Sequence, residues 1–130
     1  MVALDTNIVI DHLRRRGNKK SALDRLNERF SRDEMGISMI TIQELYEGKS
    51  TLDPNKEGEM VILLGSLKIF PYSYEVAKKS GEMARDLGRP IEIPDAAIAA
   101  TCLVNRCQLA TLDKKDFVGI EGLEILEVKV

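Results

Sequence analysis

Three aspartates stand at the edges of apolar segments, where a carboxylate could take part in chemistry. Asp5 follows Val-Ala-Leu, Asp95 precedes an alanine-rich segment, and Asp113 follows Leu-Ala-Thr-Leu. A buried ionised group costs free energy unless it is paired or bound to a metal ion. These positions therefore indicate either a local structural role or a metal site.

The positions of the acids favour a metal site. They follow predicted strands or begin predicted helices, and in a parallel sheet such positions share the carboxyl edge, where ligands bind. Two carboxylates about 4 Å apart repel by about 4 kcal/mol at an effective dielectric near 20. We expect a divalent cation to relieve this repulsion, held by Asp5, Glu44, Asp95 and Asp113. Ligands that are all oxygen select Mg²⁺ or Mn²⁺, and such ions support phosphodiester hydrolysis.

Each acid also has a simpler explanation as a helix cap. Aspartate is a favoured N-cap residue, so Asp5 could cap a helix that begins near Asn7. Thr41-Ile-Gln-Glu44 matches the Thr-x-x-Glu capping box. Asp95 and Asp113 could each begin a helix or a turn. Taken singly, each acid fits a cap better than a ligand, and only their shared edge favours the metal site.

Short apolar strands alternate with helices along the chain. Hydrophobic periodicity and breaker residues predict strands over 2–4, 35–40, 67–70, 108–112 and 123–128. Helices are predicted over about 8–16, 21–30, 41–48, 57–66, 73–87 and 96–105, with a turn over 113–117. This alternation predicts one α/β domain over residues 1–130, with a mostly parallel sheet between two layers of helices.

Composition excludes several classes of protein. The net charge of −2 does not favour nucleic-acid binding by bulk charge, and 5% aromatic residues do not favour an extended base-stacking surface. The apolar runs are too short to span a membrane, and the N-terminus lacks a signal-peptide pattern, so we expect a cytoplasmic protein. One histidine and two cysteines do not form a zinc-binding pattern. We expect Cys102 and Cys107 to be packing residues and His12 to lie on the exposed side of the first helix.

Four motifs in sequence order resemble the PIN-domain family, and most closely its VapC-type toxin ribonucleases. The motifs extend over most of the chain and are Leu4-Asp5-Thr6-Asn7, Thr41-x-x-Glu44, Ile93-Pro94-Asp95-Ala96-Ala97-Ile98-Ala99-Ala100-Thr101 and Thr111-Leu112-Asp113-Lys114-Lys115-Asp116-Phe117. The resemblance implies a three-layer α/β/α fold and endoribonuclease activity that depends on Mg²⁺ or Mn²⁺.

The resemblance also implies roles for individual residues. Asp5, Glu44 and Asp95 would be the core metal-binding acids. Many relatives carry Asn at the position of Asp113 and an acid at the position of Asp116, so either could be the fourth acid. We favour Asp113, because it is nearer the strand end, with Asp116 farther out. The polar side chains that would orient these acids or a water molecule are Thr6, Asn7 and Thr111, although turn hydrogen bonding explains them equally well.

Partners are implied by the same resemblance. Such toxins form homodimers and are held inactive by a small antitoxin, which often directs an arginine at the acids. Basic clusters could hold RNA phosphates beside the acidic site, although solvated helix ends are the ordinary explanation. The candidate residues are Arg14, Arg15, Arg16, Lys114 and Lys115.

Three other functions remain open on the sequence. An aspartyl-phosphate phosphatase would need a second aspartate two residues after Asp5, where this chain has Asn7. A non-cleaving RNA-binding domain is disfavoured because all the acids are present. A housekeeping nuclease of the same fold, acting in RNA maturation, would carry the same acids.

Overall fold

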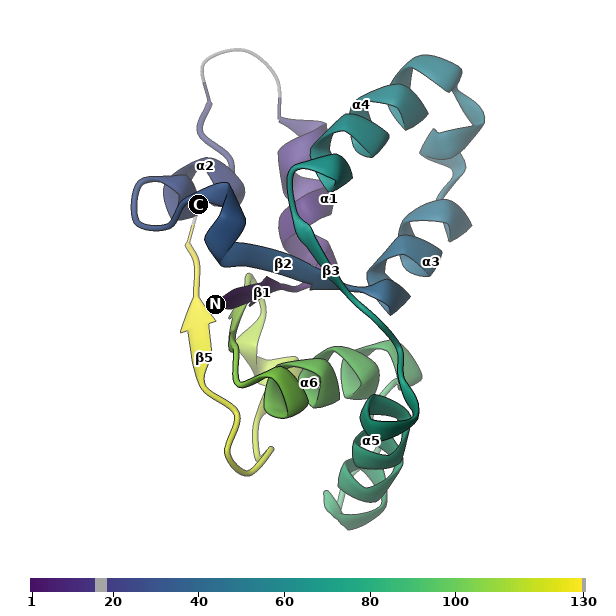
Figure 1. Cartoon of the computed structure of the whole chain (residues 1–130), viewed down its shortest axis with the longest axis vertical. Coiled ribbons are helices and arrows are strands. Elements are labelled where there is room, and N and C mark those ends of the chain that lie inside the picture. The colour runs from purple at the N-terminus through teal and green to yellow at the C-terminus, as the bar shows by residue number, and fades with distance from the viewer. Residues whose placement is uncertain (16–18, 130) are drawn as a thin grey trace.

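The sheet lies between two groups of helices. The computed structural model describes residues 1–15 and 19–129. Helices α1, α2, α3 and α4 lie on one side of the sheet in the view of Figure 1, and α5 and α6 lie on the other. This arrangement confirms the predicted three-layer α/β/α fold.

In the described part of the chain the sheet has five strands, all paired in parallel. The strands are β1 (Val2–Leu4), β2 (Met35–Ser38), β3 (Lys68–Phe70), β4 (Gln108–Thr111) and β5 (Ile125–Glu127), in the spatial order β3-β2-β1-β4-β5. The chain builds outward from β1 to β3 and then returns to continue from β4 on the other side. The boundary between β1 and β4 is therefore the topological switch point, where a crevice opens at the carboxyl ends of the strands.

Helices and short 3₁₀ helices connect the strands. They are α1 (Thr6–Arg14), α2 (Ala22–Asn27), α3 (Met39–Glu47), α4 (Pro54–Gly65), α5 (Tyr74–Asp86) and α6 (Ile93–Asn105), with short 3₁₀ helices η1 (Arg32–Glu34), η2 (Lys49–Leu52) and η3 (Lys114–Phe117). Helix α1 follows β1 directly and α3 follows β2 directly, so the first turns of both helices lie at the carboxyl edge.

Alternation along the strands divides the buried side chains between two cores. Val2 and Leu4 of β1 face α1, α2 and α4, whereas Ala3 faces α6. In the same way Ala110 of β4 belongs to the first core and Leu109 to the second. Because both faces of the sheet are covered, the strands are almost wholly apolar, and the polar side chains gather at their ends.

Several predicted boundaries were displaced by capping. Helix α3 begins at Met39 rather than at Thr41, because Ser38 is the N-cap and its hydroxyl accepts a hydrogen bond from the Ile40 amide. Helix α4 begins three residues early, since Asp53 caps it and Pro54 occupies its first turn. Helix α2 is shorter than predicted and ends at Asn27.

No helix in the described part of the chain is long and apolar enough to cross a membrane.

Candidate active site

Asp5 lies at the switch point, directly after β1. Its amide donates to the Ala110 carbonyl of β4, which fixes the backbone at the strand end. The side chain is only 5% exposed and caps α1, with Oδ1 accepting from the Thr6 amide at 2.8 Å. The predicted capping role of Asp5 is thus confirmed. Capping uses one carboxylate oxygen, however, and leaves the burial of the charge to be explained.

The second oxygen of Asp5 is held by a hydroxyl from the neighbouring strand. Thr111 Oγ1 donates to Asp5 Oδ2 at 2.7 Å. The same hydroxyl oxygen accepts from the Asp113 amide at 3.0 Å and, more weakly, from Asn7 Nδ2 at 3.5 Å. One donated and two accepted bonds use the full capacity of a hydroxyl group. Thr111 therefore fixes the orientation of Asp5 and ties the end of β4 to the start of α1.

Glu44 is held by the hydroxyl group of Thr6, the residue whose amide also donates to Asp5. Thr6 Oγ1 donates to Glu44 Oε1 at 2.6 Å and lies 3.0 Å from Thr41 Oγ1. Because a hydroxyl has one proton, Thr41 donates to Thr6 while Thr6 donates to Glu44. The capping-box explanation of Thr41 and Glu44 is wrong, since both lie inside α3 and reach toward α1. Glu44 is thereby held beside the start of α1.

Asp95 approaches the site from the opposite layer, in the first turn of α6. Its pKa is raised to about 6, chiefly by burial and additionally by the charges of Asp5, Asp116 and Glu44, in that order. The pKa of Asp5 is also raised to about 6, chiefly by burial and additionally by the charges of Glu44 and Asp116, against its hydrogen bonds from Thr111 and Thr6. Acids from four separate segments therefore share one electrostatic environment.

The last two acids are placed differently from one another. Asp116 lies in η3 and lines a hollow of about 240 Å³ together with Asp95. Asp113 instead has its carboxylate 3.9 Å from Lys115 Nζ. Among the described residues, the charge of Asp113 is not one of the main causes of the raised pKa of Asp5 or Asp95. Asp116, and not Asp113, is therefore among the acids whose charges contribute most to raising the pKa values of Asp5 and Asp95.

The donor set fits a hard divalent cation. The side chains gathered here offer carboxylate oxygens, which Mg²⁺ and Mn²⁺ prefer, and positive charge would offset the repulsion that raises the two pKa values. Among residues 1–15 and 19–129, no three Asp, Glu, His or Cys side chains are already close enough to hold one ion together. The fit therefore rests on the donor chemistry and the electrostatics of the acids.

The basic residues proposed from the sequence lie around the acids at different positions. Lys115 is exposed and lines the same hollow as Asp95 and Asp116, whereas Lys114 has its ammonium 3.8 Å from the Glu127 carboxylate. Arg14 is exposed on α1 and lines one groove with Glu44. Arg15 is bound to Asp11, with a contact of 3.0 Å. Arg16 lies outside the described residues.

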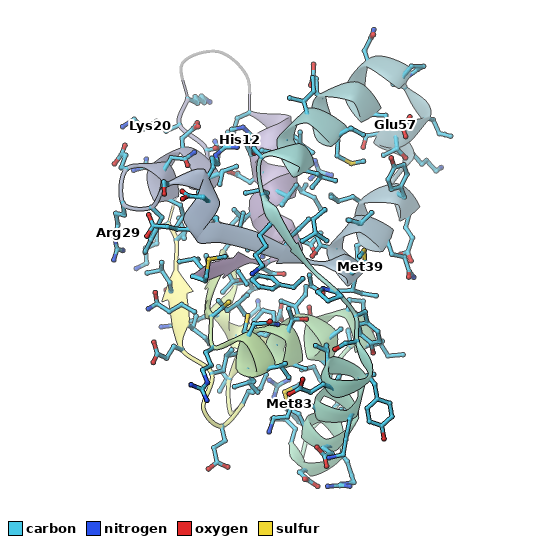
Figure 2. All side chains as sticks on the ribbon, viewed as in Figure 1. His12, Lys20, Arg29, Met39, Glu57 and Met83 are labelled. Carbon is cyan, nitrogen blue, oxygen red and sulfur yellow. The ribbon has the colours of Figure 1, made fainter. Side chains whose placement is uncertain are left out.

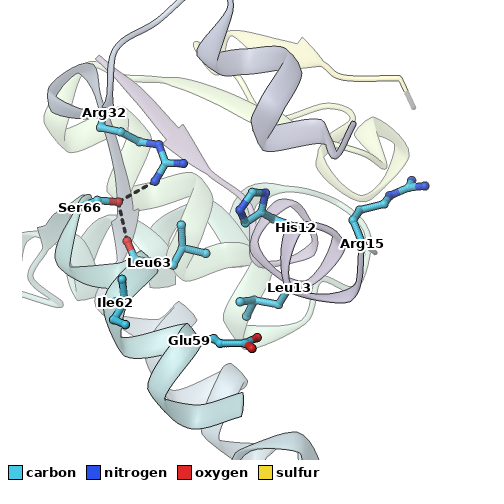
Figure 3. A pocket seen from close by; sticks show the side chains of 8 residues that line it. All are labelled: His12, Leu13, Arg15, Arg32, Glu59, Ile62, Leu63 and Ser66. Atoms are coloured by element: carbon cyan, nitrogen blue, oxygen red, sulfur yellow. Dashed lines mark hydrogen bonds between the residues drawn. The ribbon is translucent and has the colours of Figure 1, made fainter. Parts of the chain in front are cut away.

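The remaining candidates lie away from the acids. His12 is not freely exposed, since its Nδ1 lies 2.6 Å from Ser21 Oγ, where α1 meets α2 (Figure 2). Figure 3 shows His12 lining a hollow of about 380 Å³ opposite Arg32, which donates to Ser66. Both cysteines are buried free thiols, and burial raises the pKa of each, as expected for packing residues.

Sequence reasoning missed two contributors. Glu92 is the N-cap of α6, and its charge adds to those that raise the pKa of Asp95. Arg89 donates to the Asp116 carbonyl. Glu92 stands three residues before Asp95, a spacing that could have drawn attention to it as a helix-start acid. The contact of Arg89 joins residues 27 positions apart and leaves no local sequence signal.

The raised pKa values predict how stability depends on pH in the absence of divalent cations. Because the folded-state pKa of Asp5 and Asp95 is about 6 against an ordinary 3.8, the folded chain binds these protons more tightly than the unfolded chain. Their contribution to stability is therefore full below about pH 4 and is lost as the pH rises through about 6. In chelator, Asp95→Asn should gain about 1 kcal/mol in free energy of unfolding relative to wild type between about pH 4 and pH 7, after allowance for solvent screening of this half-buried group.

Urea unfolding at a series of pH values measures this difference. The exposed Glu121→Gln variant, whose charge is not among the main causes of the raised pKa of Asp5 or Asp95, serves as the control and should show no such gain. A difference between Asp95→Asn and wild type that does not change with pH would contradict the assigned environment of Asp95.

Solved structures of other proteins share this fold. A toxin–antitoxin complex from Klebsiella pneumoniae contains a chain with 27% identity and a TM-score of 0.76, covering 97% of this chain and 96% of that one. A chain in DNA-bound VapBC from Salmonella typhimurium has 24% identity, a TM-score of 0.85 and the same coverage. A chain in VapBC-1 from nontypeable Haemophilus influenzae has 25% identity and a TM-score of 0.79, and the match covers 97% of this chain and 96% of that one.

A search of curated protein sequences finds no match. The family profile of the PIN domain, in contrast, matches residues 2–122, a range that includes Asp5, Glu44, Asp95, Asp113 and Asp116. Members of this family are typically nucleases. The chain belongs to the PIN-domain family.

Proposed function

We propose that residues 1–130 act as one metal-dependent PIN nuclease domain that hydrolyses RNA and works as the toxin of a toxin–antitoxin pair. One observation carries the proposal. Asp5 and Asp95 reach the switch point of the sheet from opposite layers of the fold, and both have pKa values raised to about 6. Burial is the main cause for each, and the charges of Glu44 and Asp116 contribute to both. Structure-stabilising acids avoid one another, so such crowding is a mark of a functional site.

The proposed site contains acids that would bind the cation and threonine hydroxyl groups that orient those acids. Asp5, Glu44, Asp95 and Asp116 would hold Mg²⁺ or Mn²⁺, and we now place Asp113 outside this group. The bound cation would supply Lewis-acid stabilisation of the charge that develops on the phosphodiester oxygens during attack by water. Thr111 and Thr6 keep Asp5 and Glu44 in fixed orientations, so little reorganisation is needed when substrate arrives.

RNA would lie across the carboxyl edge with its phosphates near exposed cations. Lys115 lines the same hollow as Asp95 and Asp116, and Arg14 lines the groove that contains Glu44. Cations on both sides of an acidic centre offset its repulsion of a polyanion. Arg15 is a weaker candidate because it contacts Asp11 at 3.0 Å, and Lys114 is weaker because it is not among the residues that line the hollow.

An antitoxin segment would occupy the groove beside Glu44. This groove has a volume of about 620 Å³ and runs between α1, α3, η2 and α4. Its apolar floor is formed by Ile10, Leu13, Leu45 and Met60. A segment with apolar residues on this floor could direct a cationic side chain at Glu44 and so block the acids. The structural neighbours, which are toxin–antitoxin complexes, support a partner of this kind.

A second copy of the chain would cover the apolar side chains around the carboxyl edge. Met39, Tyr74 and Ile93 are exposed at the first turns of α3, α5 and α6. Tyr74 is 83% exposed, which is unusual for a large side chain beside an active site. Their position would place two acidic sites near one interface.

The proposed reaction predicts RNA cleavage that depends on a divalent metal ion and that requires Asp116 but not Asp113. Purified protein, free of partner, should cut labelled structured RNA such as tRNA with Mn²⁺ or Mg²⁺ and not in chelator. Asp95→Asn and Asp116→Asn should each lose at least about a hundredfold in rate, which corresponds to about 3 kcal/mol. Asp113→Asn, the matched control, should retain most of the activity.

Calorimetry of Mn²⁺ binding to the same variants accompanies the assay. A well-folded protein that neither cuts any RNA tried nor binds the metal would refute the nuclease and favour a non-cleaving RNA-binding domain. Cleavage restricted to precursor RNAs, with no growth inhibition on expression, would favour a housekeeping nuclease. Loss of activity in Asp113→Asn but not in Asp116→Asn would reverse the choice of fourth acid.

The groove proposal predicts that filling the groove weakens inhibition without affecting catalysis. A small protein encoded by an adjacent reading frame should co-purify with the chain and suppress cleavage. Ser50→Trp adds bulk at the exposed rim of the groove and should weaken this complex at least tenfold while the free protein still cuts RNA. Glu124→Trp, an exposed position outside the groove lining, should have no effect, and equal effects of both variants would contradict the groove.

The dimer proposal predicts the mass of the protein in solution. Sedimentation equilibrium should give about twice the chain mass of 14.6 kDa for wild type and the single mass for Tyr74→Glu. Ile62→Glu is a matched control, because Ile62 is 78% exposed but lies on α4, away from the first turns that surround the acids. A monomeric wild type, or dissociation caused by both variants, would count against this interface.

A further inference from the structure

The backbone hydrogen bonds at the two ends of the segment that carries Asp116 are long. At its start the Asp116 amide lies 3.3 Å from the Asp113 carbonyl, and at its end the Val118 amide lies 3.5 Å from the Lys115 carbonyl. Both distances exceed the usual range of about 2.7–3.2 Å for N–H···O bonds. Phe117 is buried and anchors the segment in the second core, but its side chain does not fix the rotation of the neighbouring peptide groups.

Arg89 supplies the missing constraint from another loop. Its Nη2 donates to the Val118 carbonyl at 2.7 Å and to the Asp116 carbonyl at 3.1 Å, and its Nη1 donates to the Pro90 carbonyl at 3.3 Å. One guanidinium group therefore bridges the segment between α5 and α6 to the carbonyls on both sides of Phe117. The two N–H bonds of Nη2 belong to the rigid planar fork of the guanidinium and reach the two carbonyls in fixed directions, which a rotating lysine ammonium matches less well.

The backbone around Arg89 presents the side chain in this direction. Gly88 ends α5 with a φ of +80°, a left-handed conformation that favours glycine. Pro90 restricts the residue before it to extended backbone and prevents the helix from continuing. The chain then turns to begin α6, whose first turn carries Asp95. Arg89 thus lies in the loop that leads to the helix carrying Asp95, and it contacts the backbone of Asp116. It also lines the hollow that these two acids share.

We propose that Arg89 is a positioning residue, which clamps η3 so that the Asp116 carboxylate faces Asp95. It acts through backbone carbonyls and does not itself contact the reacting groups. The inference rests on the proposed nuclease function and extends it to a residue outside the acid set. A competing role for Arg89 is a direct contact to an RNA phosphate, since it lines the same hollow as Lys115.

The test uses Arg89→Lys, which keeps the positive charge but loses the fork. Amide hydrogen exchange over residues 113–118 should become at least several-fold faster in this variant, whether or not RNA is present. In the presence of Mn²⁺, kcat for labelled RNA should fall roughly tenfold and the Kd for Mn²⁺ should rise roughly tenfold, with KM little changed. Arg85→Lys is the matched control, because Arg85 is exposed and bonded to its neighbour Asp86.

A double-mutant cycle identifies the route of the effect. If Arg89 acts through Asp116, Arg89→Lys should have little further effect on kcat in an Asp116→Asn background. An undiminished effect there, or a rise in KM with kcat unchanged, would overturn the positioning role and favour a phosphate contact. Unchanged hydrogen exchange would overturn the clamp itself. If wild type neither binds Mn²⁺ nor cuts RNA, the nuclease proposal fails, while the exchange measurement still decides whether Arg89 clamps η3.

Discussion

Repulsion between carboxylates held out of water is the constraint on which the site depends. Asp5 is almost completely buried at the strand end, and Asp95 reaches the same place from the opposite layer. The repulsion can persist only because the surrounding core fixes both backbones: β1 and β4 flank Asp5, and a run of buried residues anchors α6 behind Asp95. The fold is thus a rigid frame that holds like charges together, as the proposed cation site requires.

The hydroxyl groups around Asp5 join the layers of this frame. Thr111 connects β4 to Asp5, and the pair Thr6 and Thr41 connects α1 to Glu44 on α3. These three threonines are buried, and their side chains would cost free energy if they lacked partners. Among the described residues, no buried side-chain nitrogen or oxygen lacks a hydrogen-bond partner. Orientation of the acids and burial of polar groups are therefore achieved by the same contacts.

Much of the fold followed from the sequence because it depends on local patterns. Apolar strands alternating with helices predict a covered parallel sheet, and Asp5, directly after the first strand, marks its carboxyl edge. Local patterns failed where the deciding contact is distant. Thr41 and Glu44 have the spacing of a capping box, yet each bonds toward Thr6, 35 and 38 residues away. Whether Asp113 or Asp116 lies near the other acids depends on the path of η3, which no local pattern determines.

The crowding of acids also bears on how the sequence can change over time. At neutral pH, burial and mutual repulsion disfavour the charged forms of Asp5 and Asp95, so neutral replacements that preserve shape would leave the fold at least as stable. Selection for stability alone would thus tend to remove these charges. Loss of the charges of Asp5 and Asp95 by drift would therefore meet no resistance from folding.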